Sequence, residues 1–252
     1  MEPGSILTKT DGAVRELTIS RPEKKNAFTV AMYASLAEEL AAADRDDVVR
    51  VVLLAGAGDA FTAGNDLADF LKSPPGAEDS SAFRLLFQLV DQEKPLVVAV
   101  DGPAVGIGTT LLLHADYVVA STRARFQLPF VSLGLSPEGG SSVLLPLLAG
   151  MARASEWLLF GEPIDAQAAR EAGLANAVVA PEELAAYALS RARALAAKPP
   201  GAVLATKRVL RSPLRAQLSD AIRYEGREFQ ERVRSPEAVA AFEAFLGKRR
   251  ER

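Results

Sequence analysis

The sequence of 252 residues predicts an α/β fold, because short apolar segments alternate with segments of helical spacing. Residues 48–55, 96–100 and 117–120 are apolar runs of strand length, and helical patterns stand between them. With 49% hydrophobic residues, the chain can bury the core of one large α/β domain, or of one domain with a helical extension.

The first part of the chain predicts one strand, one loop and one helix. Residues 14–20 alternate enough to form an early strand, which the turn Asp11-Gly12 introduces. A polar loop follows at residues 21–26. A helix is expected from Thr29, a candidate N-cap, to Ala43. Its inward face carries three apolar residues, Met32, Leu36 and Leu40.

Two further helices are predicted around the middle strands. Pro74-Pro75-Gly76 indicates a mobile loop at residues 73–81, and helical spacing returns at residues 82–92. The glycine-rich segment 102–108 follows the strand at 96–100, and the apolar run 109–113 predicts a short buried helix.

The C-terminal part of the sequence is helical. A helix at residues 165–172, stopped by Gly173, precedes a short strand at 177–179. Helical spacing then runs from residue 182 to Gly247, with breaks at residues 199–201 and at Pro213. Ser235 is a good N-cap for the last helix, and Gly247 is a good end. A face with Val239, Phe242 and Phe245 is expected to cover the core or a neighbouring subunit. We therefore divide the chain into a core, residues 1–196, and a helical region, residues 197–252.

Composition excludes several classes of function. The net charge is −3 with both signs interspersed, so nucleic acid is not an expected partner. Cysteine is absent, which excludes disulfides and thiol chemistry, and the one histidine, His114, makes a zinc site or a Ser-His pair improbable. We expect His114 to be a core residue, and we expect no metal. There is no apolar run of membrane-spanning length and no signal-peptide pattern, so a cytoplasmic protein without a membrane partner is expected.

Glu138 is the one formally charged residue between Arg125 and Arg153. Pro137 precedes it and Gly139-Gly140 follow, so the backbone there is fixed on one side and free to approach a neighbour closely on the other. A carboxylate removed from water costs free energy unless it is paired or used. This segment alone leaves two interpretations open, an exposed turn or a functional acid.

Two glycine loops offer backbone N–H groups. The spacing G-x-x-x-G-x-G at residues 102–108 is neither the dinucleotide motif nor a P-loop. Glycines before a helix nevertheless expose N–H groups to an anion, and Gly64-Asn65-Asp66 offers another such group after the strand at 48–55. Together the loops could form an oxyanion hole, or they could be two ordinary tight turns.

With Glu138 added, these segments resemble the crotonase, or enoyl-CoA hydratase/isomerase, family. The matching segments keep the family's order and extend over nearly the whole chain: residues 21–28, 61–67, 102–108, 115–116 and 124–129. The resemblance implies a spiral of ββα units, a C-terminal helical trimerisation region and acyl-CoA thioester substrates. It also implies that the oxyanion donors are the backbone N–H groups of Asn65 and Ile107.

The departures from the family pattern favour its isomerase branch. Hydratases of the family carry two glutamates that activate water, and the matching positions here are Thr110 and Phe130. Residues 133–139 resemble instead the Δ3,Δ2-enoyl-CoA isomerases, which use one glutamate in a Pro-Glu-Gly segment. The expected reaction moves the double bond of a 3-enoyl-CoA to give 2-trans-enoyl-CoA, with Glu138 as base and then acid.

The resemblance also suggests binding residues. Phe245 and Lys248 resemble the residues with which the family contacts coenzyme A. The alternative is that Phe245 is a packing residue and Lys248 a solvated one. Lys24 and Ala63 are weaker candidates for contacts to coenzyme A. Thr110, Phe130 and Leu133 are expected near the acyl pocket, with residues 74–81 and 85–87 along the acyl tunnel. The expected assembly is a homotrimer or a dimer of trimers, and no cofactor is expected apart from the coenzyme A of the substrate. The alternatives are a hydratase, an isomerase of a ring-containing acyl-CoA, and a non-catalytic acyl-CoA-binding protein.

Overall fold

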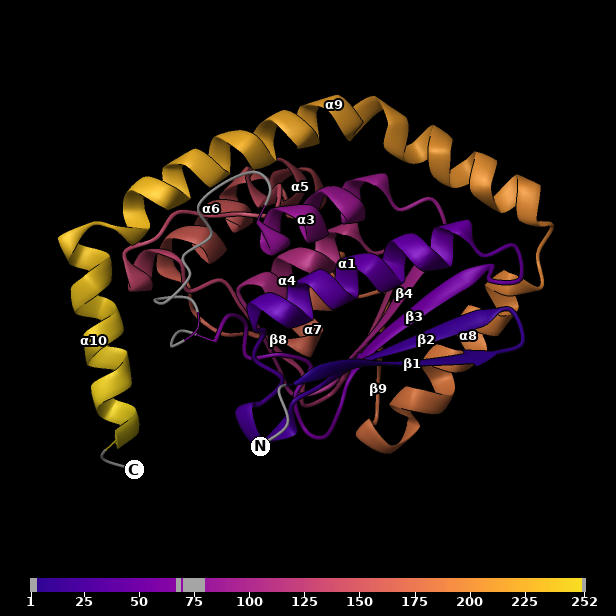
Figure 1. The fold of residues 1–252 in the computed structure, drawn as a ribbon, viewed down its shortest axis with the longest axis horizontal. Coiled ribbons are helices and arrows are strands. Elements are labelled where there is room, and N and C mark those ends of the chain that lie inside the picture. Colours follow the sequence, from indigo (N-terminus) through magenta and orange to yellow (C-terminus); the bar gives the residue numbers. More distant parts are fainter. Residues whose placement is uncertain (1–3, 67–68, 70–79, 251–252) are drawn as a thin grey trace.

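A six-stranded sheet forms the centre of the molecule (Figure 1). The computed structural model describes residues 4–66, 69 and 80–250, with side chains up to residue 244 in the last helix. The strand order is β1 (Ser5–Asp11), β2 (Val14–Ser20), β3 (Val51–Gly56), β4 (Leu96–Val100), β6 (Tyr117–Ser121) and β9 (Ala177–Val179). β1 pairs antiparallel with β2, and the other pairs are parallel. The predicted α/β class is confirmed.

The sheet is covered on both faces because its central strands are apolar on both sides. Leu54 and Val98 belong to the main core, which α1 (Val30–Arg45) and α3 (Ser81–Asp91) cover. Leu53 and Val97 pack with α8 (Leu184–Ala196) on the opposite face. Thr29 caps α1 by accepting a hydrogen bond from the N–H of Met32, and the predicted inward face of this helix is buried.

One predicted strand needs correction, and one strand was not predicted. The third strand begins at Val51 and not at Val48, whose side chain is exposed in the preceding turn. β1 was not predicted, because five of its seven residues are exposed and it therefore lacks an apolar pattern. Each residue of β1 pairs with a residue of β2, from Ser5 opposite Ser20 to Asp11 opposite Val14, and this pairing holds the strand in the sheet.

A small second sheet and a set of short helices form the layer that carries the candidate site. β5 (Pro103–Val105), β7 (Arg125–Gln127) and β8 (Ile164–Asp165) make this sheet. The short helices and turns are η1 (Pro22–Lys24), α4 (Ile107–Thr110), η2 (Leu111–His114), η3 (Val131–Leu133), α5 (Ser141–Ala149), α6 (Met151–Phe160), α7 (Ala166–Glu171) and η4 (Pro181–Glu183). A loop was predicted at residues 73–81. The part of this segment before Ser80 lies outside the described residues.

α9 (Pro200–Val233) arches over the whole molecule, and α10 (Pro236–Arg250) turns away from its end (Figure 1). The predicted break at Pro213 is wrong, because α9 continues through this residue. An interior proline removes one hydrogen bond and can bend a helix, but tertiary contacts can hold the helix across it. Ser235 caps α10 as predicted, by accepting from the N–H of Ala238 at 3.2 Å. The helix runs past Gly247, and it buries Ala238 and Phe242 while Val239 is 43% exposed.

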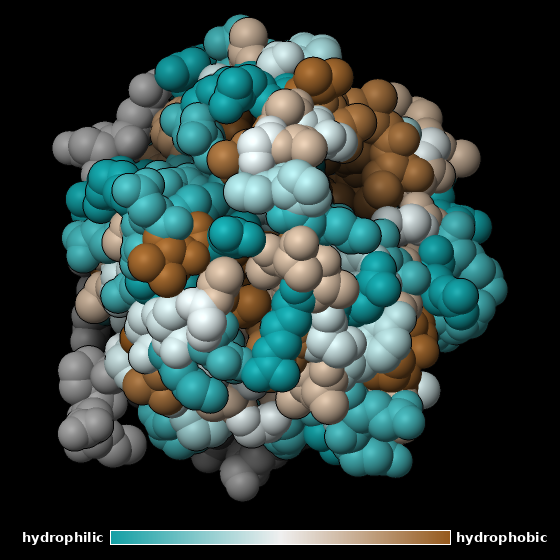
Figure 2. Space-filling view, turned by 90° about the vertical axis from the view of Figure 1, so that its right-hand side faces the viewer, coloured by the Kyte–Doolittle hydropathy of each residue, from teal (hydrophilic) through white to brown (hydrophobic). Residues whose placement is uncertain are grey.

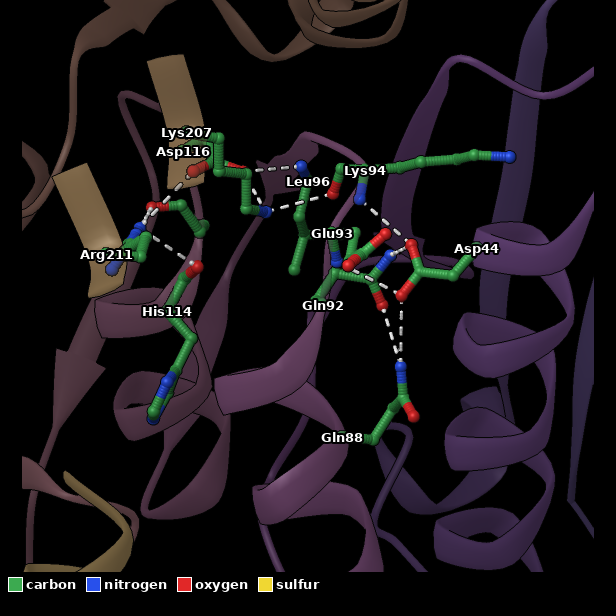
Figure 3. Close-up of polar contacts among 11 residues, drawn as sticks. Asp44, Gln88, Gln92, Glu93, Lys94, Leu96, His114, Asp116, Lys207 and Arg211 are labelled. Carbon is green, nitrogen blue, oxygen red and sulfur yellow. Dashed lines mark hydrogen bonds and ion pairs between the residues drawn. The ribbon is translucent and has the colours of Figure 1, made fainter. Parts of the chain in front are cut away.

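A polar network fixes the first half of α9 on the core (Figure 3). The Nζ of Lys207 donates to the carbonyl oxygen of Lys94 at 2.9 Å and to the carboxylate of Asp116 at 2.6 Å. Arg211 donates to the carbonyl oxygens of His114 at 3.1 Å and Ala115 at 2.8 Å. These contacts set the course of α9, whose second half reaches the candidate site.

The side of the molecule where α9 begins has a hollowed hydrophobic surface (Figure 2). A hollow of about 640 Å³ lies between α8, the first half of α9 and the ends of β4 and β6. Its apolar walls include Val97, Leu195, Val203 and Leu210. Among the helices in the described ranges, none combines the length and hydrophobicity needed to cross a bilayer.

Candidate active site

Glu138, Asn65 and Ile107, which the sequence places far apart, line one cavity of about 370 Å³. Helices α1, α3 and α9 supply most of its wall. Apart from Glu138, Asn65 and Ile107, the wall is mainly apolar and aromatic, with Phe28, Tyr33, Phe83, Leu86, Ile222 and Phe229. A mostly apolar cavity with a few convergent polar groups is the usual form of a small-molecule site.

The carboxyl group of Glu138 accepts a hydrogen bond from the hydroxyl group of Thr110 at 2.5 Å. The pKa of Glu138 is raised to about 7, mainly by burial; the hydrogen bond from Thr110 lowers it, and the negative charge of Glu225 contributes to the rise. A carboxyl group with this pKa can both accept and return a proton near neutral pH.

The turn that carries Glu138 needs its two glycines. Gly139 and Gly140 both have positive φ, +73° and +76°. A Cβ at Gly139 would lie 3.1 Å from the side chain of Thr110, so a side chain there would push Thr110 away from Glu138. The main chain of Glu138 is held too, because its carbonyl oxygen accepts a hydrogen bond from the hydroxyl group of Ser141 at 2.7 Å.

His114 is buried in η2, as predicted for a core residue, but it also holds this turn. Its Nε2 lies 2.7 Å from the carbonyl oxygen of Gly139. A carbonyl oxygen only accepts hydrogen bonds, so Nε2 carries the proton. Burial lowers the pKa of His114 to about 4, and the ring is therefore neutral at pH 7.

The N–H groups of Asn65 and Ile107 come from two loops that are hydrogen-bonded to each other. The N–H of Thr62 donates to Pro103 at 3.0 Å, and the N–H of Val105 donates to Thr62 at 3.0 Å. Gly64 permits this approach: its φ is +84°, and a Cβ there would lie 2.7 Å from the carbonyl oxygen of Val105. Within the described part of the chain, neither the Asn65 nor the Ile107 N–H has a backbone or side-chain acceptor, so both are available to a ligand.

Tyr33 and Arg21 fix the loop around Asn65. The hydroxyl group of Tyr33 donates to the side-chain oxygen of Asn65 at 2.6 Å. Arg21 donates to the carboxylate of Asp66 at 2.7 Å and to the carbonyl oxygen of Ala27 at 3.1 Å. Asp66 therefore helps to fix this loop through its ion pair with Arg21, 45 residues earlier in the chain.

The predicted binding residues whose side chains the structure describes lie outside the cavity wall. Thr110 contacts the wall residue Glu138, Phe130 is buried in the core, and Leu133 is partly buried in η3. Lys24 is exposed in η1, and Ala63 is tied to Lys25 through its N–H at 2.8 Å. Phe245 and Lys248 belong to α10, but their side chains lie outside the described residues. Their proposed roles remain predictions.

Sequence reasoning missed Glu225, a glutamate of α9 that is 4% exposed. Its Oε2 accepts a hydrogen bond from the N–H of Gly140 at 2.7 Å, and its Oε1 accepts one from the N–H of Ser142 at 2.9 Å. A signal was present, because Ile222, Glu225 and Phe229 are three and four residues apart and share one helix face.

The chain has the crotonase fold and belongs to the enoyl-CoA hydratase/isomerase family, whose model matches residues 9–252. The chain is 38% identical to enoyl-CoA delta isomerase 2 of Homo sapiens over 97% of its own length, but it spans only 63% of that relative. It is also 38% identical to 1,2-epoxyphenylacetyl-CoA isomerase of Escherichia coli (strain K12), over 97% of this chain and 96% of the relative.

A solved structure shares the fold over nearly the full length. The enoyl-CoA hydratase/isomerase from Pseudoalteromonas atlantica T6c superposes with a TM-score of 0.93 at 42% identity. The match covers 96% of this chain and 97% of that one. The crotonase fold predicted from the sequence is therefore confirmed.

Proposed function

We propose that the protein is a Δ3,Δ2-enoyl-CoA isomerase in which Glu138 moves the proton. The observation that carries the proposal is the position of Glu138, which lines the same cavity as Asn65 and Ile107, the residues whose N–H groups have no acceptor within the described part of the chain. Thr110 and Phe130 stand where the family's hydratases carry carboxylates. The site therefore has a base and an oxyanion hole, without the pair that activates water.

The chemistry requires one carboxyl group. The C2 protons of a 3-enoyl thioester are acidic because they lie between the carbonyl group and the double bond. Ionised Glu138 removes one of them, and the negative charge moves to the thioester oxygen of a dienolate. The N–H groups of Asn65 and Ile107 stabilise this oxygen, a contribution of about 10²–10³ in rate per donor. Glu138 then returns the proton to C4, which gives the 2-trans-enoyl product.

The remaining parts of the proposal concern binding and assembly. Lys24, Ala63, Phe245 and Lys248 are proposed contacts to coenzyme A, and Phe130 and Leu133 are proposed to support the acyl pocket. Proton transfer within the substrate needs no separate cofactor. A homotrimer or a dimer of trimers, and a cytoplasmic location, remain predictions.

The test is an assay of the purified protein with a trans-3-enoyl-CoA, followed by the ultraviolet absorption of the conjugated 2-enoyl thioester. The variant Glu138→Gln keeps the shape of the side chain and removes the base, so we expect kcat to fall by about 10²–10⁴-fold. Glu156→Gln, which changes an exposed glutamate of α6, is the matched control. Wild-type activity in the Glu138 variant would refute the assignment.

A second candidate is an isomerase of a ring-containing acyl-CoA that uses the same base and oxyanion hole. The aromatic wall formed by Phe28, Tyr33, Phe83 and Phe229 favours it, as does the full-length likeness to the 1,2-epoxyphenylacetyl-CoA isomerase. Comparing kcat/KM for straight-chain 3-enoyl-CoAs and ring-containing acyl-CoAs separates the two. Adding a 2-enoyl-CoA tests for a hydratase, which would release 3-hydroxyacyl-CoA.

A further inference from the structure

Glu225 reaches the turn of Glu138 from a helix 85 residues further along the chain. Its two oxygens accept the N–H groups of Gly140 and Ser142, at 2.7 and 2.9 Å. Gly140 is the N-cap of α5 and has no side chain to satisfy the free N–H groups of this helix end. Glu225 therefore does the work of an N-cap from a different helix.

These contacts favour the ionised form of Glu225. Both oxygens accept hydrogen bonds, and a carboxylate is an acceptor at both positions. The positive end of the α5 dipole also favours a negative charge here. Burial acts in the opposite direction and raises the pKa of Glu225, while the hydrogen bonds from Ser142 and Gly140 lower it. The N–H groups of Gly140 and Ser142 are thus the structural reason to assign a negative charge to Glu225.

The charge of Glu225 lies close to Glu138, and two like charges in a poorly solvated region oppose each other's ionisation. We propose that Glu225 is a positioning residue: its carboxylate holds the turn that carries Glu138, and its negative charge disfavours the ionised form of Glu138. This inference rests on the proposed role of Glu138. It identifies Glu225 as the residue that positions the turn of Glu138 and disfavours the ionised form of Glu138.

The other polar groups around the two glutamates are accounted for by partners of their own. Thr110 of α4 donates to Glu138, Tyr33 of α1 donates to Asn65, and neutral His114 of η2 binds Gly139. Of the cavity's remaining carboxylates, Asp66 is paired with Arg21, and Asp69 accepts the N–H of Val30 at 3.0 Å. On α9 itself, Arg223 lies over the ring of Phe87 and Arg227 over that of Tyr224. Glu225 is thus the charge that contacts the turn directly.

The test uses Glu225→Gln, which removes the charge and can accept only one of the two N–H groups, in the full-length protein. We expect the midpoint of the kcat/KM–pH profile to fall by about half to one pH unit, because a like charge is gone. We expect kcat to fall about tenfold with little change in KM, because the turn loses one anchor. Glu231→Gln, at an exposed position of α9, is the control and should match the wild type.

A second variant and a second measurement cover the other outcomes. Glu225→Asp keeps the charge but is too short to reach both N–H groups, so it should keep the wild-type midpoint and still lose kcat. An infrared titration of the Glu138 carboxyl group, identified by the band that Glu138→Gln removes, reports the same midpoint without turnover. It therefore tests Glu225 even if the proposed reaction fails. A folded Gln variant with the wild-type midpoint would overturn the charge effect, and a folded Asp variant with wild-type kcat would overturn the positioning role.

Discussion

The hydroxyl group of Thr110 donates a hydrogen bond to the carboxyl group of Glu138 at 2.5 Å. By the family resemblance, Thr110 matches a position where hydratases are expected to carry a glutamate. The change replaces a second acid with a neutral donor, and the donor favours the ionised, proton-accepting form of Glu138. In the proposed isomerase, Thr110 therefore adjusts the pKa of the base.

Thr110→Val removes this donor and keeps the shape of the side chain. The pKa of Glu138 should rise above its value of about 7, so the ionised fraction at pH 7 should fall. We expect kcat/KM at pH 7 to fall about three- to tenfold and to recover in part by pH 9. A pH profile of isomerisation measures the shift, and Thr122→Val, at an exposed site, is the control. An unshifted profile would contradict this account of Thr110.

Glu138 should make the fold less stable as the pH rises. Its folded-state pKa is about 7 and its ordinary value is 4.5, so the native state binds more protons than the unfolded state between these values. The free energy of unfolding therefore falls as the pH rises from about 4.5 to about 7. Below pH 4.5 Glu138 is protonated in both states and adds no pH dependence. Relative to Glu138→Gln, the wild type should lose about 1–3 kcal/mol between pH 4.5 and pH 8. Urea unfolding of both proteins across this range measures the difference, and parallel curves would argue against a raised pKa.

Gly226 should be required for the shape of the cavity. It faces the ring of Phe83 so closely that an added Cβ would lie 2.0 Å from Cζ. Gly226→Ala should displace the ring, reshape the cavity, and lower the free energy of unfolding by about 1–3 kcal/mol. KM for long acyl chains should change more than KM for short ones. Gly201→Ala is the control on the same helix, because no atom lies within 4 Å of its added Cβ. Equal effects of the two changes would contradict the packing argument.

The sequence predicted the parts of the site that local chemistry marks. Glu138 was singled out because an isolated charge in an apolar segment is unusual. The glycine loops indicated only that N–H groups are exposed, and the family resemblance implied that those of Asn65 and Ile107 are the oxyanion donors. Glu225 was missed because α9 is rich in charged residues, and only tertiary packing distinguishes this buried glutamate from the half-buried Glu228 and the exposed Glu231. For the same reason Pro213 was misread: the contacts of Lys207 and Arg211 hold the helix on course before the proline.

Lys207 should be one of the residues that fix α9 on the core. Its Nζ lies in a mostly buried position 2.6 Å from the carboxylate of Asp116, which also accepts the N–H of Leu96 (Figure 3). Lys207→Ala leaves Asp116 with a weaker partner, Arg211, at 3.4 Å. Removing one partner of a buried pair is costly, so the free energy of unfolding should fall by about 2–4 kcal/mol.

Urea unfolding at pH 7 measures this loss, and Arg208→Ala, at the neighbouring exposed position, should change it by less than about 0.5 kcal/mol. The first half of α9 sets the course of its second half, which carries Glu225. Lys207→Ala should therefore also lower kcat for the proposed isomerisation, while the midpoint of its pH profile stays closer to the wild type than that of Glu225→Gln. If Lys207→Ala lost stability but kept full kcat, the two halves of the helix would act independently, and the turn of Glu138 would be held by Glu225 without help from the anchor at Asp116.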